Sequence, residues 1–126
     1  MLTRLLARVE DLGARVEWAR ITGPHAGAYD LASRTIYLDW DLDSRPRHAV
    51  STLAHELAHH VYQDAGFGDV WVERRADVWA ARLLICPGQY ARAERLYDGD
   101  PHQIAFDLGV TTRLVRAYQG SLARAA

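Results

Sequence analysis

Hydrophobic and polar positions repeat at two different spacings along the chain. Apolar residues three and four apart predict a helix over residues 2–12, whereas alternation over 15–21 predicts a strand. Short apolar runs at 28–31 and 35–38 flank turn-forming residues and predict a hairpin. Helical spacing then returns over about 46–63, 71–84, 89–96, 101–108 and 111–122. The pattern predicts an α+β fold, in which a small antiparallel sheet packs on a mostly helical domain.

Length and composition fit one domain. A chain of 126 residues, 49% of them hydrophobic, can bury one sizeable core but hardly two, so we predict a single domain over 1–126. The formal net charge is -1, which argues against broad electrostatic binding of nucleic acid. A single cysteine, no signal peptide and no apolar stretch long enough to span a bilayer together predict a cytoplasmic protein without a membrane partner.

The helix over 46–63 has recognisable start and stop signals. Ser44 is the expected N-cap, Pro46 lies in the first turn, and the helix is expected to end near Gln63. Its apolar positions form one stripe, and a group of polar residues falls to the side of that stripe. A polar group on a helix beside the core is where a metal site can be built.

The polar group is His55-Glu56-Leu57-Ala58-His59, which reads H-E-x-x-H. His55 and His59 are four residues apart on the helix, so both imidazoles project from one face at roughly 6 Å separation. Two imidazoles at that spacing can bind one zinc ion. Glu56 is then placed to accept a proton from a water molecule at that metal. The alternative is a pair of surface histidines beside a solvated glutamate.

The next helix, over 71–84, offers a third ligand. Glu73 and Asp77 are four residues apart and share a face. Glu73 can complete a His-His-Glu zinc site, and Asp77 can accept a hydrogen bond from the free ring nitrogen of a ligating histidine. The alternative is a solvated acidic face that pairs with Arg74, Arg75 and Arg82.

The two helical segments together resemble the ImmA/IrrE family of metallopeptidases. Residues 55–59 match that family's H-E-[LI]-[AG]-H, and residues 73–84 match its E-x-x-A-[DN]-x-[FW]-A-x-x-L-[LM]. The likeness extends over roughly residues 29–118. It is also similar to the gluzincin pattern, in which the glutamate binds zinc and the aspartate orients a histidine. The resemblance implies a zincin-like metallopeptidase core with one zinc ion per chain.

By this resemblance, His55, His59 and Glu73 would be the metal ligands, Glu56 the catalytic base and Asp77 the residue that orients a histidine. It implies a cytoplasmic zinc-dependent endopeptidase. The expected partner is a helix-turn-helix transcriptional repressor, whose cleavage relieves repression of phage, mobile-element or stress-response genes. Similar ligands also accept Mn²⁺ or Fe²⁺. The alternative is a catalytically silent module that keeps the fold for binding proteins.

Hydrolysis at such a site needs a further hydrogen-bond donor for the developing oxyanion. The candidates are Tyr29, Tyr62, Tyr90, His60 and His102. His60 adjoins a ligand but points about 100° away from it on the helix, so we do not expect it to bind the metal.

A substrate peptide can lie extended along an edge strand beside the metal, held by main-chain hydrogen bonds. The candidate strand is Thr35, Ile36, Tyr37 and Leu38, which precedes the helix that carries H-E-x-x-H. The alternative is an ordinary strand of the core.

The segment over about 101–123 has the pattern of a helix-turn-helix. Gly109 supplies the turn, and Arg113 and Arg116 could contact phosphate, which keeps DNA binding as a further alternative. The other interpretation is that these helices close the core, as they often do in the resembled family. The balanced charge favours this second interpretation, so direct binding of nucleic acid is not expected.

Overall fold

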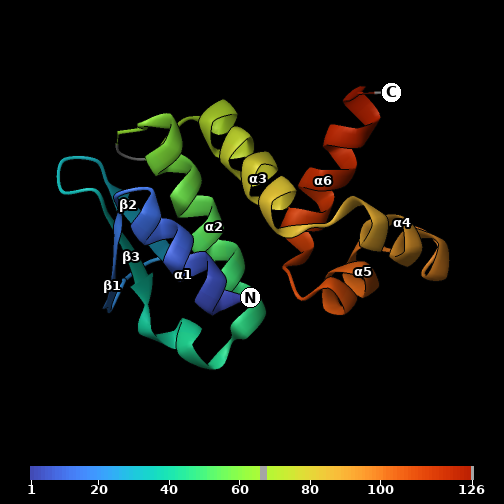
Figure 1. The fold of residues 1–126 in the computed structure, drawn as a ribbon, viewed down its shortest axis with the longest axis horizontal. Coiled ribbons are helices and arrows are strands. Elements are labelled where there is room, and N and C mark those ends of the chain that lie inside the picture. Colours follow the sequence, from blue (N-terminus) through green and yellow to red (C-terminus); the bar gives the residue numbers. More distant parts are fainter. Residues whose placement is uncertain (66–67, 126) are drawn as a thin grey trace.

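The computed structural model describes residues 1–65 and 68–125 (Figure 1). These residues form six α-helices, one short 3-10 helix and three strands, which confirms the predicted α+β, mostly helical fold. The elements in chain order are α1 (Leu2–Asp11), β1 (Arg15–Ala19), β2 (Gly27–Asp30), β3 (Thr35–Asp39), η1 (Trp40–Ser44), α2 (Pro46–Tyr62), α3 (Val70–Leu84), α4 (Pro87–Leu96), α5 (Pro101–Leu108) and α6 (Thr112–Ala125). Across the described ranges, no helix combines the length and the apolar character needed to cross a membrane.

The sheet is mixed, with the strand order β1-β3-β2. β2 and β3 form the predicted antiparallel hairpin, and Arg34 adopts a positive φ of 54° in its turn. β1 lies on the other side of β3 and runs parallel to it. The prediction of an antiparallel sheet is therefore wrong for β1. After β1 the chain crosses to the opposite side of β3, where β2 begins the hairpin.

β3 is the central strand, which overturns the prediction of a substrate-binding edge at 35–38. Thr35, Ile36, Tyr37 and Leu38 pair with β1 on one side and with β2 on the other. Ile36 and Leu38 are fully buried, as expected of an ordinary core strand. Because β3 is paired on both sides, it has no free edge for a peptide. The edges of the sheet are β1 and β2.

α2 lies between the sheet and α3 and carries the H-E-x-x-H motif (Figure 1). The helix begins at Pro46 with Arg45 as the N-cap residue, whereas the predicted N-cap, Ser44, is the last residue of η1. It ends where predicted, since Gln63 is the C-cap and adopts a left-handed conformation with φ of 58°. The apolar stripe of α2 is buried against the sheet and the neighbouring helices.

The tail helices pack on the same core as α2 and α3. Gly109 has a φ of 74° and makes the turn between α5 and α6, as predicted. The inner face of α6 buries Leu114, Val115 and Tyr118, and this helix contacts both α3 and α5. The docking of α6 on α3 brings the start of α6 close to the face of α3 that carries Glu73.

Candidate metal centre

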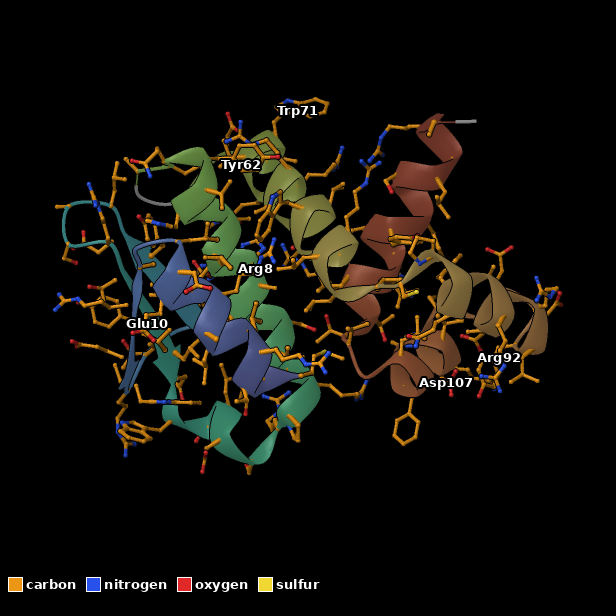
Figure 2. All side chains as sticks on the ribbon, in the orientation of Figure 1. Arg8, Glu10, Tyr62, Trp71, Arg92 and Asp107 are labelled. Atoms are coloured by element: carbon orange, nitrogen blue, oxygen red, sulfur yellow. The ribbon has the colours of Figure 1, made fainter. Side chains whose placement is uncertain are left out.

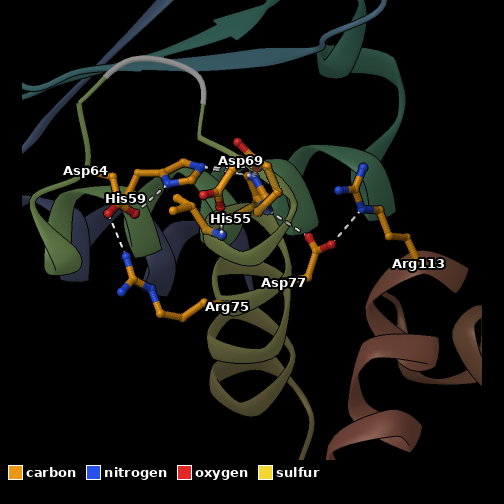
Figure 3. Close-up of polar contacts among 9 residues, drawn as sticks. His55, His59, Asp64, Asp69, Arg75, Asp77 and Arg113 are labelled. Carbon is orange, nitrogen blue, oxygen red and sulfur yellow. Dashed lines mark hydrogen bonds and ion pairs between the residues drawn. The ribbon is translucent and has the colours of Figure 1, made fainter.

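Three ligand atoms from two helices converge on one point (Figure 3). His55 and His59 project from α2, and Glu73 lies in the first turn of α3. Nε2 of His55 is 2.7 Å from Oε2 of Glu73 and 3.2 Å from Nε2 of His59. Nε2 of His59 is 3.4 Å from the same carboxylate oxygen. Because the three ligand atoms all lie within 4.8 Å of one another, this group can hold a metal ion.

The donor set fits zinc. Two imidazole nitrogens and one carboxylate oxygen are ligands that zinc accepts at catalytic sites, where a fourth position stays open for water. His59 is buried, whereas 30% of the Glu73 side chain is exposed, so the group is reached by solvent from the α3 side. Helical spacing brings the two histidines together, and the packing of α3 on α2 adds the glutamate.

Asp77 holds the ring of His55. Its Oδ1 is 2.8 Å from Nδ1 of His55, which is the contact predicted from the sequence, and its Oδ2 accepts a hydrogen bond of 2.8 Å from Nε of Arg113 on α6. Burial opposes ionisation of Asp77, but the hydrogen bonds from His55 and Arg113 outweigh it and lower the pKa of this carboxyl. Burial would likewise lower the pKa of His55, but Asp77 and the nearby carboxylates of Glu56 and Glu73 raise it overall. We call His55, Asp77 and Arg113 the His55 arm.

An equivalent set of contacts, which the sequence analysis missed, holds His59. Oδ2 of Asp64 is 2.9 Å from Nδ1 of His59, and Oδ1 of Asp64 accepts a hydrogen bond of 2.6 Å from Nη2 of Arg75 (Figure 3). Arg75 also lies 4.0 Å above the ring centre of Tyr62. Asp64 follows the C-cap of α2, where no helical spacing rule relates it to the motif. We call His59, Asp64 and Arg75 the His59 arm.

The two aspartates favour the same tautomer in both rings. A carboxylate at Nδ1 favours the ring form with its proton on Nδ1, which leaves the lone pair of Nε2 free for a metal. Both Nε2 atoms point at the carboxylate of Glu73. The site is therefore preorganised as a set of three electron-pair donors.

Glu56 lies in the cleft beside the three ligands and is 7% exposed. Burial raises the pKa of its carboxyl, and the neighbouring histidines only partly oppose this effect. The edge strand β2 approaches this helix closely at Gly27, where an added Cβ would lie 2.6 Å from Cγ2 of Thr52 and 3.2 Å from Cγ of Glu56. Glycine at position 27 therefore lets the β2 backbone run beside the carboxylate, a requirement that was not visible in the sequence.

The cleft above the metal centre has a volume of about 620 Å³. It is lined by the loop before β2, by α2, by α3 and by the beginning of α6. Polar side chains in this lining, besides those of the metal-ligand group, include those of His25, His48, Thr52, Thr112 and Arg113. The cleft therefore contains hydrogen-bond donors, although they are not the ones expected from the sequence.

The five side chains proposed as oxyanion donors, Tyr29, His60, Tyr62, Tyr90 and His102, are not among the residues that line this cleft. The hydroxyl of Tyr29 is 2.7 Å from Nδ1 of His60, whose Nε2 is 2.7 Å from the carbonyl oxygen of Leu12. His60 thus links α2 to α1, and both of its ring nitrogens have partners outside the group formed by His55, His59 and Glu73.

The other three candidates have different structural surroundings. Tyr62 lies under Arg75 on another face of the molecule. Tyr90 is buried, with its ring centre 4.8 Å from that of Tyr118. His102 is exposed beside Thr112, at 3.3 Å from its hydroxyl.

No family model matches the chain. A search of the curated proteins also finds no match. The interpretation of the centre therefore rests on its geometry and on the chemistry of its donor atoms.

Proposed function

We propose that this protein is a zinc-dependent endopeptidase of the ImmA/IrrE type, built on a zincin-like core. The observation that carries the proposal is the convergence of His55, His59 and Glu73, with the carboxylate of Glu56 buried beside them in an open cleft. Two aspartates that hold the histidine rings support it, since ligating histidines in metal sites commonly have such partners.

In the proposed mechanism, His55, His59 and Glu73 would hold the metal, and the two arms keep both Nε2 atoms directed toward the carboxylate of Glu73. A zinc ion held there would supply Lewis acidity and would lower the pKa of a water molecule toward about 7. Glu56 accepts the proton of the attacking water and then donates it to the nitrogen of the departing amine. Burial raises the pKa of Glu56, which suits a group that must take up a proton and release it near neutral pH.

We place the substrate on β2 in place of β3. β2 is an edge strand, and its first residue, Gly27, lines the cleft beside Glu56. A peptide paired with β2 would be held by main-chain hydrogen bonds that demand no particular sequence. The variant Gly27→Ala puts a methyl group against Thr52 and Glu56, so it should impair cleavage more than zinc binding. Unchanged cleavage by a folded, zinc-loaded Gly27→Ala protein would argue against this placement.

The test of hydrolysis compares zinc-loaded wild type with Glu56→Gln on a library of proteome-derived peptides, with new N-termini read by mass spectrometry. We expect cleavage by the wild type and none by Glu56→Gln, while both bind zinc equally. Cleavage by Glu56→Gln at the wild-type rate would refute the assignment of the base, and an inactive, zinc-loaded wild type would refute the proposed activity.

The proposed natural substrate is a helix-turn-helix repressor, as the family resemblance implies. Where such a repressor is encoded beside the gene for this protein, it is the substrate to incubate with wild type and with Glu56→Gln. We expect one or a few specific cuts made by the wild type alone. An intact repressor under conditions where the peptide library is cut would leave a peptidase with a different protein substrate.

A further inference from the structure

A second hollow, of about 720 Å³, lies on another face of α3 and is lined by five arginines. They come from three helices that are distant in the sequence, namely α1, α3 and α6. We call this hollow the arginine groove and define it by Arg8, Arg74, Arg75, Arg82 and Arg124. All five residues are exposed.

Three aromatic side chains line the same groove: Tyr62, Trp71 and Trp79. Figure 2 shows Tyr62 and Trp71 projecting from neighbouring ends of α2 and α3. Trp71 is 72% exposed, which is unusual for so large an apolar side chain. The guanidinium of Arg74 lies 5.4 Å from its ring centre, so the indole and the positive charge form one surface.

The charge of the groove is unbalanced, although that of the chain is not. Among its described lining residues there is no aspartate or glutamate. Of the five arginines, Arg75 alone makes a salt bridge to a carboxylate in the described part of the chain, namely to Asp64. The whole chain has a net charge of -1, so this local excess of positive charge favours an anionic partner.

The arginine groove connects with the metal cleft. A third hollow, of about 500 Å³, lies between α3 and α6. It shares Arg74 and Arg124 with the groove, and it shares Glu73 and Arg113 with the metal cleft. Arg116 also lines this third hollow, and so do the carboxylates of Asp69 and Asp77. The three hollows therefore form one continuous surface, which suits an extended chain better than a small anion.

We propose that the arginine groove binds an acidic segment of a polypeptide whose neighbouring residues enter the metal cleft. This inference rests on the proposed endopeptidase function and names its substrate class, proteins with a run of Asp and Glu near the cleaved bond. Guanidinium groups bind carboxylates through paired hydrogen bonds, and the exposed indole of Trp71 covers apolar parts of the segment. A nucleic acid is the competing polyanion, but the lining residues shared with the metal cleft, where a peptide bond is proposed to be cut, favour a polypeptide.

The test measures binding of a fluorescein-labelled, glutamate-rich peptide by fluorescence anisotropy. The protein is Glu56→Gln, in which hydrolysis is expected to be blocked, so the peptide stays intact. The same peptide with glutamine at every glutamate should bind at least about fivefold more weakly, because charge-assisted hydrogen bonds are lost. The further change Arg74→Ala with Arg82→Ala should weaken binding of the acidic peptide about tenfold.

The matched control removes two exposed arginines from α4, Arg92→Ala with Arg95→Ala, neither of which lines any of the three hollows. Figure 2 shows Arg92 well apart from Tyr62 and Trp71. It should leave binding unchanged. Circular dichroism and zinc content show whether both double variants fold and keep the metal centre.

Two results would overturn the inference. One is equal binding of the acidic and neutral peptides, or an equal loss of affinity for the acidic peptide in the groove double variant and in the α4 double variant. The other is tight binding of an oligodeoxythymidylate of equal charge without binding of the acidic peptide, which would assign the groove to nucleic acid. Failure of the peptidase proposal is distinguishable, since a protein without hydrolytic activity would still bind the acidic peptide through Arg74 and Arg82.

Discussion

The two histidines of the candidate metal centre are held in the same way by different parts of the fold. In the His55 arm, the aspartate lies within α3 and its arginine comes from α6. In the His59 arm, the aspartate follows the end of α2 and its arginine comes from α3. Each arm places a carboxylate on Nδ1 and a guanidinium on that carboxylate, so the same chemical requirement has been met twice from unrelated positions.

The two arms differ in the part of the fold that each one joins to the candidate metal centre. Arg113 is at the beginning of α6, so the His55 arm depends on the docking of the tail helices. Arg75 lines the arginine groove, so the His59 arm depends on the opposite surface of α3. Binding of zinc should therefore respond to changes in two separate regions, and the following variants test whether it responds equally.

Removal of either ligating imidazole should have the largest effect. We expect His55→Ala and His59→Ala each to lose more zinc affinity than the roughly 10–100-fold typical of supporting residues, because a ligand of the metal is lost. The measurement is competition for zinc with a chromophoric chelator. A His60→Ala variant is the matched control, since His60 bonds Tyr29 and the Leu12 carbonyl and should leave zinc affinity near that of wild type. Stoichiometric zinc in His59→Ala at wild-type affinity would remove this histidine from the site.

Loss of the supporting carboxylates should have the next largest effect. Asp77→Asn and Asp64→Asn keep the shape of each side chain but remove the negative charge that orients the ring. Each should weaken zinc binding by about 10–100-fold. Both aspartate side chains are 11% exposed, so we expect similar losses from the two variants. An effect of Asp77→Asn without one of Asp64→Asn would show that the arms are not equivalent and that the contact at His59 is incidental.

The arginines should have the smallest effect on zinc, because they are partly exposed. The side chain of Arg113 is 68% exposed and that of Arg75 is 45% exposed. Exposed ion pairs contribute about 0.2–1 kcal/mol, so Arg113→Ala and Arg75→Ala should weaken zinc binding by no more than about fivefold.

Hydrogen exchange can separate the two arginine variants. The amides of α6 should exchange faster in Arg113→Ala but not in Arg75→Ala, since only Arg113 belongs to α6. Identical exchange of α6 in both variants would show that the His55 arm does not depend on the tail.

The parts of this site that were predictable from the sequence lie within single helices. His55 and His59 are related by helical spacing, and so are Glu73 and Asp77. The bounds of most helices were also predictable, because apolar periodicity and residues such as Pro46 and Gly109 mark them directly. The helix with His55 and His59 could be paired with the helix of Glu73 because a zinc site needs a third protein ligand.

The parts that were missed depend on how elements pack. Asp64 and Arg113 reach the histidines only through the path of the chain after α2 and the docking of α6 on α3. The parallel pairing of β1, and with it the central position of β3, depends on which side of the hairpin the chain crosses. No local pattern encodes that choice, so the edge strand was assigned to Ile36 and its neighbours instead of to Gly27 on β2.

The central claim is that His55, His59 and Glu73 form a zinc site. Elemental analysis of purified wild type beside Glu73→Ala, after both have been supplied with zinc and dialysed, tests it most directly. We predict about one zinc ion per wild-type chain, as a site with three protein ligands and an open position requires, and a clear loss of zinc in the variant. A wild-type protein that stays free of zinc, or a Glu73→Ala protein that holds zinc equally well, would contradict the claim.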